Sequence, residues 1–182
     1  AESLTSGPIT GQFQSEFAKY VGSKYAFAAS SCTTALHMAT QLIGLKKGDE
    51  VIVPPITFVA TSQPAMAHGA KLVFADVDPK TFNMDPDDVA RKITKKTRAI
   101  FPVHYAGHPV DMDPIMAMAK KHKLVVIDDA AHSPGAEYKG KKIGVVGHLT
   151  CFSFHSLKNM STLGEGGMLT TANKKWAEEI PI

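Results

Sequence analysis

The stretch Leu124-Val125-Val126-Ile127-Asp128-Asp129 decides the predicted fold. A short apolar run that ends in acidic residues is typical of a strand buried inside a parallel sheet. Strand-like and helix-like segments alternate on both sides of it. The other expected strands cover 25–29, 51–53, 72–74, 99–103, 149–154 and 168–171, and the expected helices cover 13–21, 33–43, 58–68, 85–93, 113–122 and a segment from 173 onward. We therefore expect a three-layer α/β/α domain with a mostly parallel sheet covered by helices on both faces.

Proline and glycine mark the expected ends of several helices. Gly22 is expected to end the first helix. Asp85 followed by Pro86 has the pattern of an N-cap with proline at the first helical position. Pro64 is expected to kink the helix over 58–68 or to end it early.

Composition and charge are those of a globular protein with one domain over residues 1–182. The chain is 44% hydrophobic and 20% charged, with a formal net charge of +3. Its lysines are scattered and no apolar run is long enough to cross a bilayer, so neither nucleic-acid binding nor membrane binding is expected. Cys32 and Cys151 form no CxxC pair and are expected to be buried free thiols in a reducing compartment. No signal peptide is recognisable, and we expect a cytoplasmic location.

Polar and aromatic residues gather where the expected strands end. In an open parallel sheet, the ligand lies outside the carboxyl ends of the strands. The residues at these positions are Ser30, Ser31, Thr57, Phe58, His104, Asp129 and Ser153. Their convergence predicts one ligand site at this edge of the sheet.

Lys158 differs from most other lysines because it follows an apolar, small-residue stretch, 151–157, instead of lying in a solvated charged group. Partial desolvation favours the neutral amine, which suits covalent bonding to a carbonyl compound. Asp129 could keep a pyridinium nitrogen protonated. Together with the glycine-rich stretch 164–167, these residues indicate a pyridoxal-phosphate (PLP) site.

The segment 30–34, Ser-Ser-Cys-Thr-Thr, follows an expected strand and opens an expected helix. Free N–H groups and hydroxyls at a helix start suit a phosphate, although a plain N-cap is the alternative. The missing GxGxxG and GxxxxGK[ST] motifs argue against a dinucleotide or a nucleoside triphosphate. Ser153, five residues before Lys158, is a second phosphate candidate.

Three residues of the expected site each have a structural alternative. His132 could contact an oxygen of the cofactor ring, but a lone histidine is more often structural. Phe58 could stack on the ring or belong to the core. Asp129 could also cap a helix or bind a metal, yet no second acid or histidine pair lies at metal-ligand spacing, and no metal is expected.

Three strings follow one another in order: DDAAHS over 128–133, FSFHSLKN over 152–159 and GEGGMLTT over 164–171. Together they resemble the sugar aminotransferases of the DegT/DnrJ/EryC1/StrS family, which are fold-type-I, aspartate-aminotransferase-like PLP enzymes. The resemblance covers nearly the whole chain. Other similar segments are 4–8 (LTSGP), 30–39 (SSCTTALHMA), 53–61 (VPPITFVAT) and 102–113 (PVHYAGHPVDMD).

The resemblance implies a role for each residue of the expected site. Lys158 would be the Schiff-base lysine, Asp129 would bind the pyridine nitrogen, and His132 would lie at the ring's 3-hydroxyl side. Phe58 would stack on the ring. The phosphate group would be bound by Ser31, Cys32, Thr33 and Ser153. Cys32 stands where the family usually has Gly or Ala. An intact Lys158 implies aminotransfer, because the dehydratase branch replaces this lysine by histidine.

The family's length and substrates imply parts that this chain does not contain. Members are about twice as long, so a short N-terminal stretch and a small C-terminal domain would lie outside this large PLP-binding domain. The implied reaction moves an amino group from glutamate or a similar donor, through PLP and its aminated form PMP, to a nucleotide-linked keto-sugar in polysaccharide or antibiotic sugar biosynthesis. The implied assembly is a homodimer with shared active sites. Arg91 is expected on the surface of a helix and Arg98 at the start of a strand, and neither is expected to clamp a substrate.

Three alternatives stay open. Another fold-type-I PLP enzyme, such as a lyase or a cysteine desulfurase, would keep the fold and change the chemistry. A PLP-binding regulatory or sensory module would bind the cofactor without turnover. The last alternative is an α/β domain without a cofactor.

Overall fold

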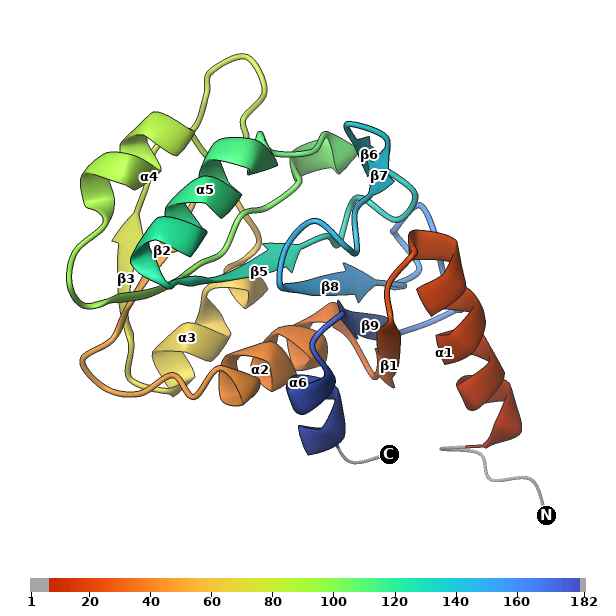
Figure 1. The fold of residues 1–182 in the computed structure, drawn as a ribbon. Coiled ribbons are helices and arrows are strands. Elements are labelled where there is room, and N and C mark those ends of the chain that lie inside the picture. Colours follow the sequence, from red (N-terminus) through yellow and green to blue (C-terminus); the bar gives the residue numbers. More distant parts are fainter. Residues whose placement is uncertain (1–6, 181–182) are drawn as a thin grey trace.

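The computed structural model describes residues 7–180 and confirms the three-layer α/β/α arrangement (Figure 1). Seven strands form one sheet in the order β1-β9-β8-β5-β4-β2-β3. The strands are β1 (Tyr25–Ala29), β2 (Glu50–Val53), β3 (Lys71–Phe74), β4 (Thr97–Ile100), β5 (Val125–Asp129), β8 (Leu149–Ser153) and β9 (Gly167–Thr171). Residues 4–6, part of a segment that resembles the family, lie outside the described residues.

The sheet is mostly parallel, as expected, and β9 is the exception. It pairs antiparallel with both β1 and β8, whereas β2, β3, β4, β5 and β8 are joined by parallel pairings. Because β9 runs in the opposite direction, its first residue, Gly167, lies at the edge where the other strands end. Residues Ala29 and Ser153 are its partners across the sheet.

Helices cover both faces of the sheet. On one face lie α1 (Pro8–Val21), α4 (Pro86–Lys92) and α5 (Met112–His122), and on the other lie α2 (Cys32–Leu42), α3 (Gln63–Ala67) and α6 (Lys174–Glu179). The alternation of side chains along a strand sets this division. In β2, Val51 and Val53 pack with α2, and Ile52 packs with α5.

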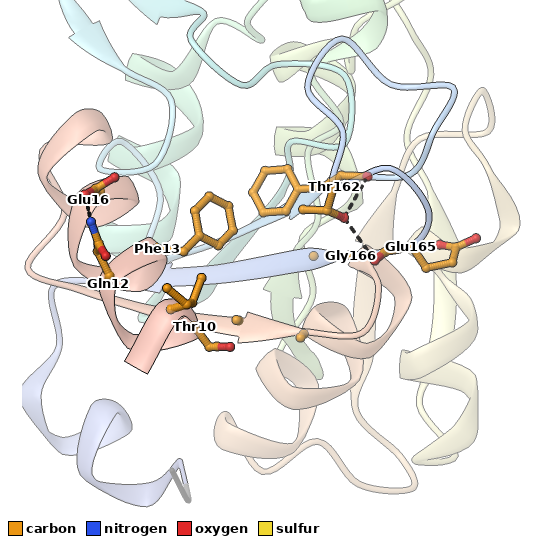
Figure 2. A pocket seen from close by; sticks show the side chains of 12 residues that line it. Thr10, Gln12, Phe13, Glu16, Thr162, Glu165 and Gly166 are labelled. Atoms are coloured by element: carbon orange, nitrogen blue, oxygen red, sulfur yellow. Dashed lines mark hydrogen bonds between the residues drawn. The ribbon is translucent and has the colours of Figure 1, made fainter. Parts of the chain in front are cut away.

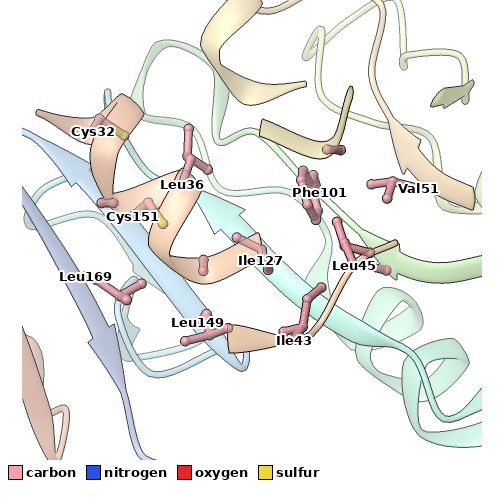
Figure 3. Packing of buried hydrophobic residues seen from close by; sticks show 14 of the residues in the cluster. Cys32, Leu36, Ile43, Leu45, Val51, Phe101, Ile127, Leu149, Cys151 and Leu169 are labelled. Carbon is pink, nitrogen blue, oxygen red and sulfur yellow. The ribbon is translucent and has the colours of Figure 1, made fainter. Parts of the chain in front are cut away.

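The core beneath α2 is made of side chains from several strands (Figure 3). Leu36 of α2 is fully buried and belongs to the same cluster as Ile127 of β5 and Leu149 of β8. Cys32 and Cys151 belong to the same cluster, and neither forms a disulfide. The expectation of buried free thiols is therefore confirmed.

Several expected helix ends are confirmed. Gly22 adopts the left-handed conformation, with a φ of 78°, directly after α1. Asp85 caps α4, since its side chain accepts a hydrogen bond from the N–H of Asp87 at 2.9 Å.

The segment 58–68 is helical with an interruption, as expected, but the interruption lies at Ser62 and not at Pro64. The segment forms a short 3-10 turn, η1 (Val59–Thr61), and then α3. Pro64 lies in the first turn of α3 and neither kinks nor ends a helix. A proline costs little at that position, because the N–H it lacks would have had no acceptor within the helix.

Three short elements were not expected from the sequence. A second 3-10 turn, η2 (Tyr105–Gly107), follows β4. The other two, β6 (Glu137–Tyr138) and β7 (Lys141–Lys142), form an antiparallel hairpin outside the main sheet. Within 7–180, the helices are all too short or too polar to cross a membrane.

Candidate functional site

Most of the predicted site residues lie at one edge of the sheet. Asp129 is the last residue of β5 and Ser153 is the last residue of β8. The segment from Ser30 to Thr33 connects the end of β1 to the start of α2. This edge is where the carboxyl ends of the parallel strands meet, as the sequence predicts.

Asp129 is a buried acid whose carboxylate is held by three donors. The residue is only 5% exposed. Oδ2 accepts a hydrogen bond from the Thr61 hydroxyl at 2.6 Å. Oδ1 accepts one from the N–H of Ala131 at 3.1 Å and a long one from the Cys32 thiol at 4.0 Å. The carboxylate therefore has one defined orientation.

Lys158 and His132 lie in direct contact. The Nζ atom of Lys158 is 3.0 Å from Nε2 of His132. Burial lowers the pKa of His132, the positive charge of Lys158 lowers it further, and Asp129 opposes them. A histidine with a lowered pKa is neutral at pH 7, so its ring nitrogen can accept a hydrogen bond from the lysine. Lys158, His132 and Asp129 thus form one electrostatic group.

The loop that carries Lys158 is closed on itself by main-chain hydrogen bonds. The N–H of Phe154 donates to the carbonyl of Gly166 at 2.8 Å, and that of Ser156 donates to Gly164 at 2.9 Å. The N–H of Lys158 donates to the carbonyl of His155 at 2.9 Å. These bonds fix the position of the main chain from which the half-buried side chain of Lys158 extends.

The start of α2 supplies donors for an anion. Ser31 is the N-cap, because its hydroxyl accepts a hydrogen bond from the N–H of Thr34 at 3.2 Å. The N–H groups of Cys32 and Thr33 lie in the first turn, where a helix offers no internal acceptor. The N-cap alternative for Ser31 is thus observed, and it leaves those amides available.

A close approach of two main chains braces this helix start. A Cβ atom added to Gly167 would lie 2.3 Å from the carbonyl carbon of Ser31 and 2.6 Å from the nitrogen of Cys32. No side chain fits in this space. β9 therefore packs directly against the loop that precedes α2.

The side chain of Cys32 faces Asp129. Burial raises the pKa of its thiol well above the usual value, and the negative charge of Asp129 raises it further. The thiol therefore keeps its proton and donates a long hydrogen bond to the carboxylate. For an anion at the start of α2, Cys32 offers its main-chain N–H.

Two residues at the strand ends differ from the rest of the group. Phe58 is 75% exposed, so it is not a core residue in the described part of the chain. His104 is fully buried and does not join the site. Its Nδ1 accepts a hydrogen bond from the N–H of Val110 at 3.1 Å, and its Nε2 lies 3.9 Å from Asp128. Asp128 points to the opposite face of the sheet from its neighbour Asp129, because successive strand residues alternate.

Thr61 is a residue of the site that was not expected from the sequence. Its hydroxyl lies 2.6 Å from that of Thr57 and 2.6 Å from Asp129. The sequence did contain one indication of this contact. Thr57 and Thr61 are four residues apart, a spacing that brings two side chains to the same side of a helical turn.

One open cavity lies apart from this group. It has a volume of about 540 Å³, and Figure 2 shows it between α1 and the segment 162–167. Phe13, Glu16 and Thr162 line it, whereas Asp129, His132 and Lys158 do not. Within 7–180, we found no cluster of three or more His, Cys, Asp or Glu side chains arranged to hold a metal ion.

The donor set fits a phosphorylated pyridine aldehyde. Free amides at a helix start suit a phosphate, a buried carboxylate suits a protonated ring nitrogen, and a half-buried amine suits an aldehyde. The fold and this edge are those of a three-layer α/β/α protein of the class that binds pyridoxal phosphate.

Comparison with known proteins gives the family. Residues 1–182 match the DegT/DnrJ/EryC1/StrS aminotransferase family, and the chain belongs to it. The expectation from the sequence is therefore confirmed.

Among curated proteins, the chain is 48% identical to the GDP-perosamine synthase of Caulobacter vibrioides over 176 residues, which are 97% of this chain and 47% of the relative. It is 46% identical over 179 residues to the spore coat polysaccharide biosynthesis protein SpsC of Bacillus subtilis, covering 98% of this chain and 46% of that protein. The chain thus spans about half the length of these curated relatives.

A solved aminotransferase from Psychrobacter cryohalolentis superposes with a TM-score of 0.93 at 46% identity, over 96% of this chain and 44% of that one. NtdA from Bacillus subtilis, solved with bound cofactor PMP, gives a TM-score of 0.90 at 36% identity, over 96% of this chain and 39% of that one.

Proposed function

We propose that the protein is a PLP-dependent aminotransferase that moves an amino group from glutamate or a similar donor to a nucleotide-linked keto-sugar. The observation that carries the proposal is the contact of Lys158 Nζ with His132 Nε2 at 3.0 Å, next to the buried Asp129. A relative named for GDP-perosamine synthesis supports a nucleotide sugar as acceptor, and NtdA with bound PMP supports the cofactor.

We assign the cofactor contacts as follows. Asp129 would hold the ring nitrogen, His132 the ring hydroxyl, and Lys158 the aldehyde carbon. Phe58 would cover one face of the ring. The phosphate would be held by Ser31, the main-chain amides of Cys32 and Thr33, and Ser153.

The chemistry divides between the cofactor and the chain. When bound, PLP supplies an electron sink for the negative charge that develops at the donor's Cα. Asp129 would stabilise a proton on the ring nitrogen, because its carboxylate is buried and held in one orientation by hydrogen bonds. The amine of Lys158 would take the proton from the donor's Cα as a general base and, as a general acid, would return it to the cofactor carbon that carried the aldehyde, on the other side of the nitrogen. His132, neutral at pH 7, would orient that amine by accepting a hydrogen bond from it.

In our proposal, the side chains that select the substrate lie outside residues 1–182, because neither arginine of this chain is placed to bind a substrate. Arg98 lies at the amino end of β4, the opposite edge from Asp129, and donates to the carbonyl of Ile43 at 3.3 Å. Arg91, in the last turn of α4, pairs with Asp88 at 2.9 Å. We propose that residues 1–182 form the large cofactor-binding domain and that a small domain of the longer protein completes the substrate pocket.

We also propose a homodimer that completes the site. Leu157 and Leu163, in the loop that carries Lys158, are 86% and 99% exposed, and Phe58 is 75% exposed. Exposed apolar side chains beside a site favour cover by another protein surface. Substituting Leu163 by Asp should shift the molar mass in light scattering from dimer to monomer, and an unchanged dimer would contradict this interface. We place the protein in the cytoplasm, where the thiols of Cys32 and Cys151 stay reduced.

The test of the proposed function is covalent capture of the cofactor. The full-length protein should absorb in the visible region with PLP, and a borohydride-reduced sample should carry the cofactor mass on the peptide that contains Lys158. Lys158→Ala should lose both signals, whereas Lys139→Ala, which removes an exposed lysine paired with Asp113, should keep them.

Two further results bear on the reaction. Glutamate should convert the bound cofactor to its aminated form, and a nucleotide keto-sugar should convert it back. Covalent cofactor on another lysine would refute the assignment of Lys158. Binding without turnover of any amino donor would favour the regulatory alternative.

A further inference from the structure

A chain of two hydroxyl groups ends on the carboxylate of Asp129. The Oγ1 atoms of Thr57 and Thr61 are 2.6 Å apart, and Thr61 Oγ1 is 2.6 Å from Oδ2 of Asp129. Thr61 is fully buried, in η1, and Thr57 is half-buried just before it.

The chemistry of the groups fixes the direction of this chain. An ionised carboxylate can only accept hydrogen bonds, so Thr61 donates its one proton to Asp129. The Thr61 oxygen then accepts from Thr57, which acts as donor. On the other carboxylate oxygen, the N–H of Ala131 and the S–H of Cys32 are also donors. These three donors, on both oxygens, hold the carboxylate in one orientation.

The Thr61 hydroxyl could have been satisfied within its own turn. Its neighbour Ser62 donates to the carbonyl of Val59 at 3.3 Å, and the buried Thr40 donates to the carbonyl of His37 at 2.8 Å. These are the ordinary local bonds of Ser and Thr in helical turns. Thr61 instead donates to the side chain of Asp129, which lies on β5 and is distant in sequence. Its hydroxyl thus contributes to the placement of Asp129 and not to its own turn.

We propose that Thr61 is a positioning residue, whose hydroxyl holds the Asp129 carboxylate so that one of its oxygens faces the cofactor's ring nitrogen. The inference rests on the proposed function, because it takes Asp129 as the partner of that nitrogen. Thr57 supports Thr61 by supplying the second hydrogen bond. Without the hydrogen bond from Thr61, the carboxylate can rotate about its side-chain bonds, and its hydrogen bond to the ring nitrogen would be formed for a smaller fraction of the time.

The test compares two cofactors in the full-length protein. One is PLP, and the other is its 1-deaza analogue, in which a C–H group replaces the ring nitrogen. Both are titrated into protein that carries Lys158→Ala, so that no covalent bond contributes, and their dissociation constants are measured by equilibrium dialysis.

Adding Thr61→Val should weaken PLP binding about tenfold or more, as expected for losing a hydrogen bond to a charged group. Binding of the deaza analogue should change less than about twofold, because it has no nitrogen for Asp129 to hold. Thr61→Ser keeps the hydroxyl and should restore PLP binding. Thr40→Val is the matched control, a buried threonine with a local bond, and should leave both constants unchanged.

Each other outcome has a definite meaning. If Thr61→Val weakens both cofactors equally, Thr61 only maintains the fold and the inference is overturned. Unchanged PLP binding overturns it as well. If the parent protein binds PLP no better than the deaza analogue, Asp129 does not hold the ring nitrogen and this inference falls while the cofactor remains. If it binds neither cofactor, the proposed function fails with it.

Discussion

Substituting Gly167 by alanine tests how β9 supports the start of α2. The added Cβ would lie 2.3 Å from the carbonyl carbon of Ser31, 2.4 Å from its oxygen and 2.6 Å from the nitrogen of Cys32. Ordinary van der Waals contact begins at 3.4 Å, so the shortest contact falls about 1.1 Å short. All three atoms belong to the main chain, and no side chain can rotate away to make room.

We expect a large effect on both stability and cofactor binding. Overpacking of a core typically costs 1–3 kcal/mol, and a clash with main chain lies at the upper end, about 3 kcal/mol. Relief requires moving the Ser31–Cys32 segment or β9 by about 1 Å, a distance that disturbs hydrogen bonds to a bound phosphate. The variant should therefore unfold at lower urea concentration and bind PLP more weakly.

The assay is urea unfolding of the full-length apoprotein followed by circular dichroism, together with a PLP titration. Gly164→Ala is the control in the same loop, since its Cβ meets nothing within 4 Å and its φ is not positive. We expect the control to change the free energy of unfolding by less than about 0.5 kcal/mol. If Gly167→Ala matches Gly164→Ala in both measurements, the close approach described here does not govern the site.

Other predictions follow from burial and charge. Leu36→Ala should lower the free energy of unfolding by about 2–5 kcal/mol in the same urea assay, because the fully buried side chain leaves a cavity; a loss below 1 kcal/mol would contradict its place in the core. Cys32 and Cys151, whose pKa values burial raises, should resist iodoacetamide at pH 8 in native protein and react once it is unfolded, and rapid native labelling would show that they are accessible. The pKa of His132 is lowered by burial and by Lys158, so the unfolded apoprotein binds a proton near pH 6.5 that the folded one does not, and stability falls as the pH drops below that value. A His132→Gln variant should lose less stability over this range, and an identical pH profile would count against the shift.

Local pattern was enough to predict the layers and the position of the site. The apolar run before Asp129 placed this acid at a strand end, and proline and glycine at 86 and 22 placed two helix ends. The alternation of strands and helices then brought Lys158, Asp129 and the start of α2 to one edge. These features depend on short-range periodicity and capping, which the sequence displays directly.

The features that were missed depend on contacts between distant segments. Nothing in residues 167–171 reveals that β9 runs antiparallel, because direction is set by which strands it joins. The hydrogen bond of Thr61 to Asp129 and the turn of the Cys32 thiol toward the same carboxylate require the packed structure. His104 was expected at the same edge as Asp129, but its side chain is buried and accepts a hydrogen bond from the N–H of Val110. Position along the chain does not fix the direction in which a side chain points.

The insertion of β9 between β1 and β8 sets the order in which the nascent protein can be completed. β1 ends the sheet, and β9 is its neighbour there, so residues 25–29 leave the ribosome long before residues 167–171 can pair with them. Until then β1 is an open edge, which exposes the growing polypeptide to association with other chains. The start of α2, which Gly167 approaches closely, can therefore take its final shape only after residues 167–171 have been translated.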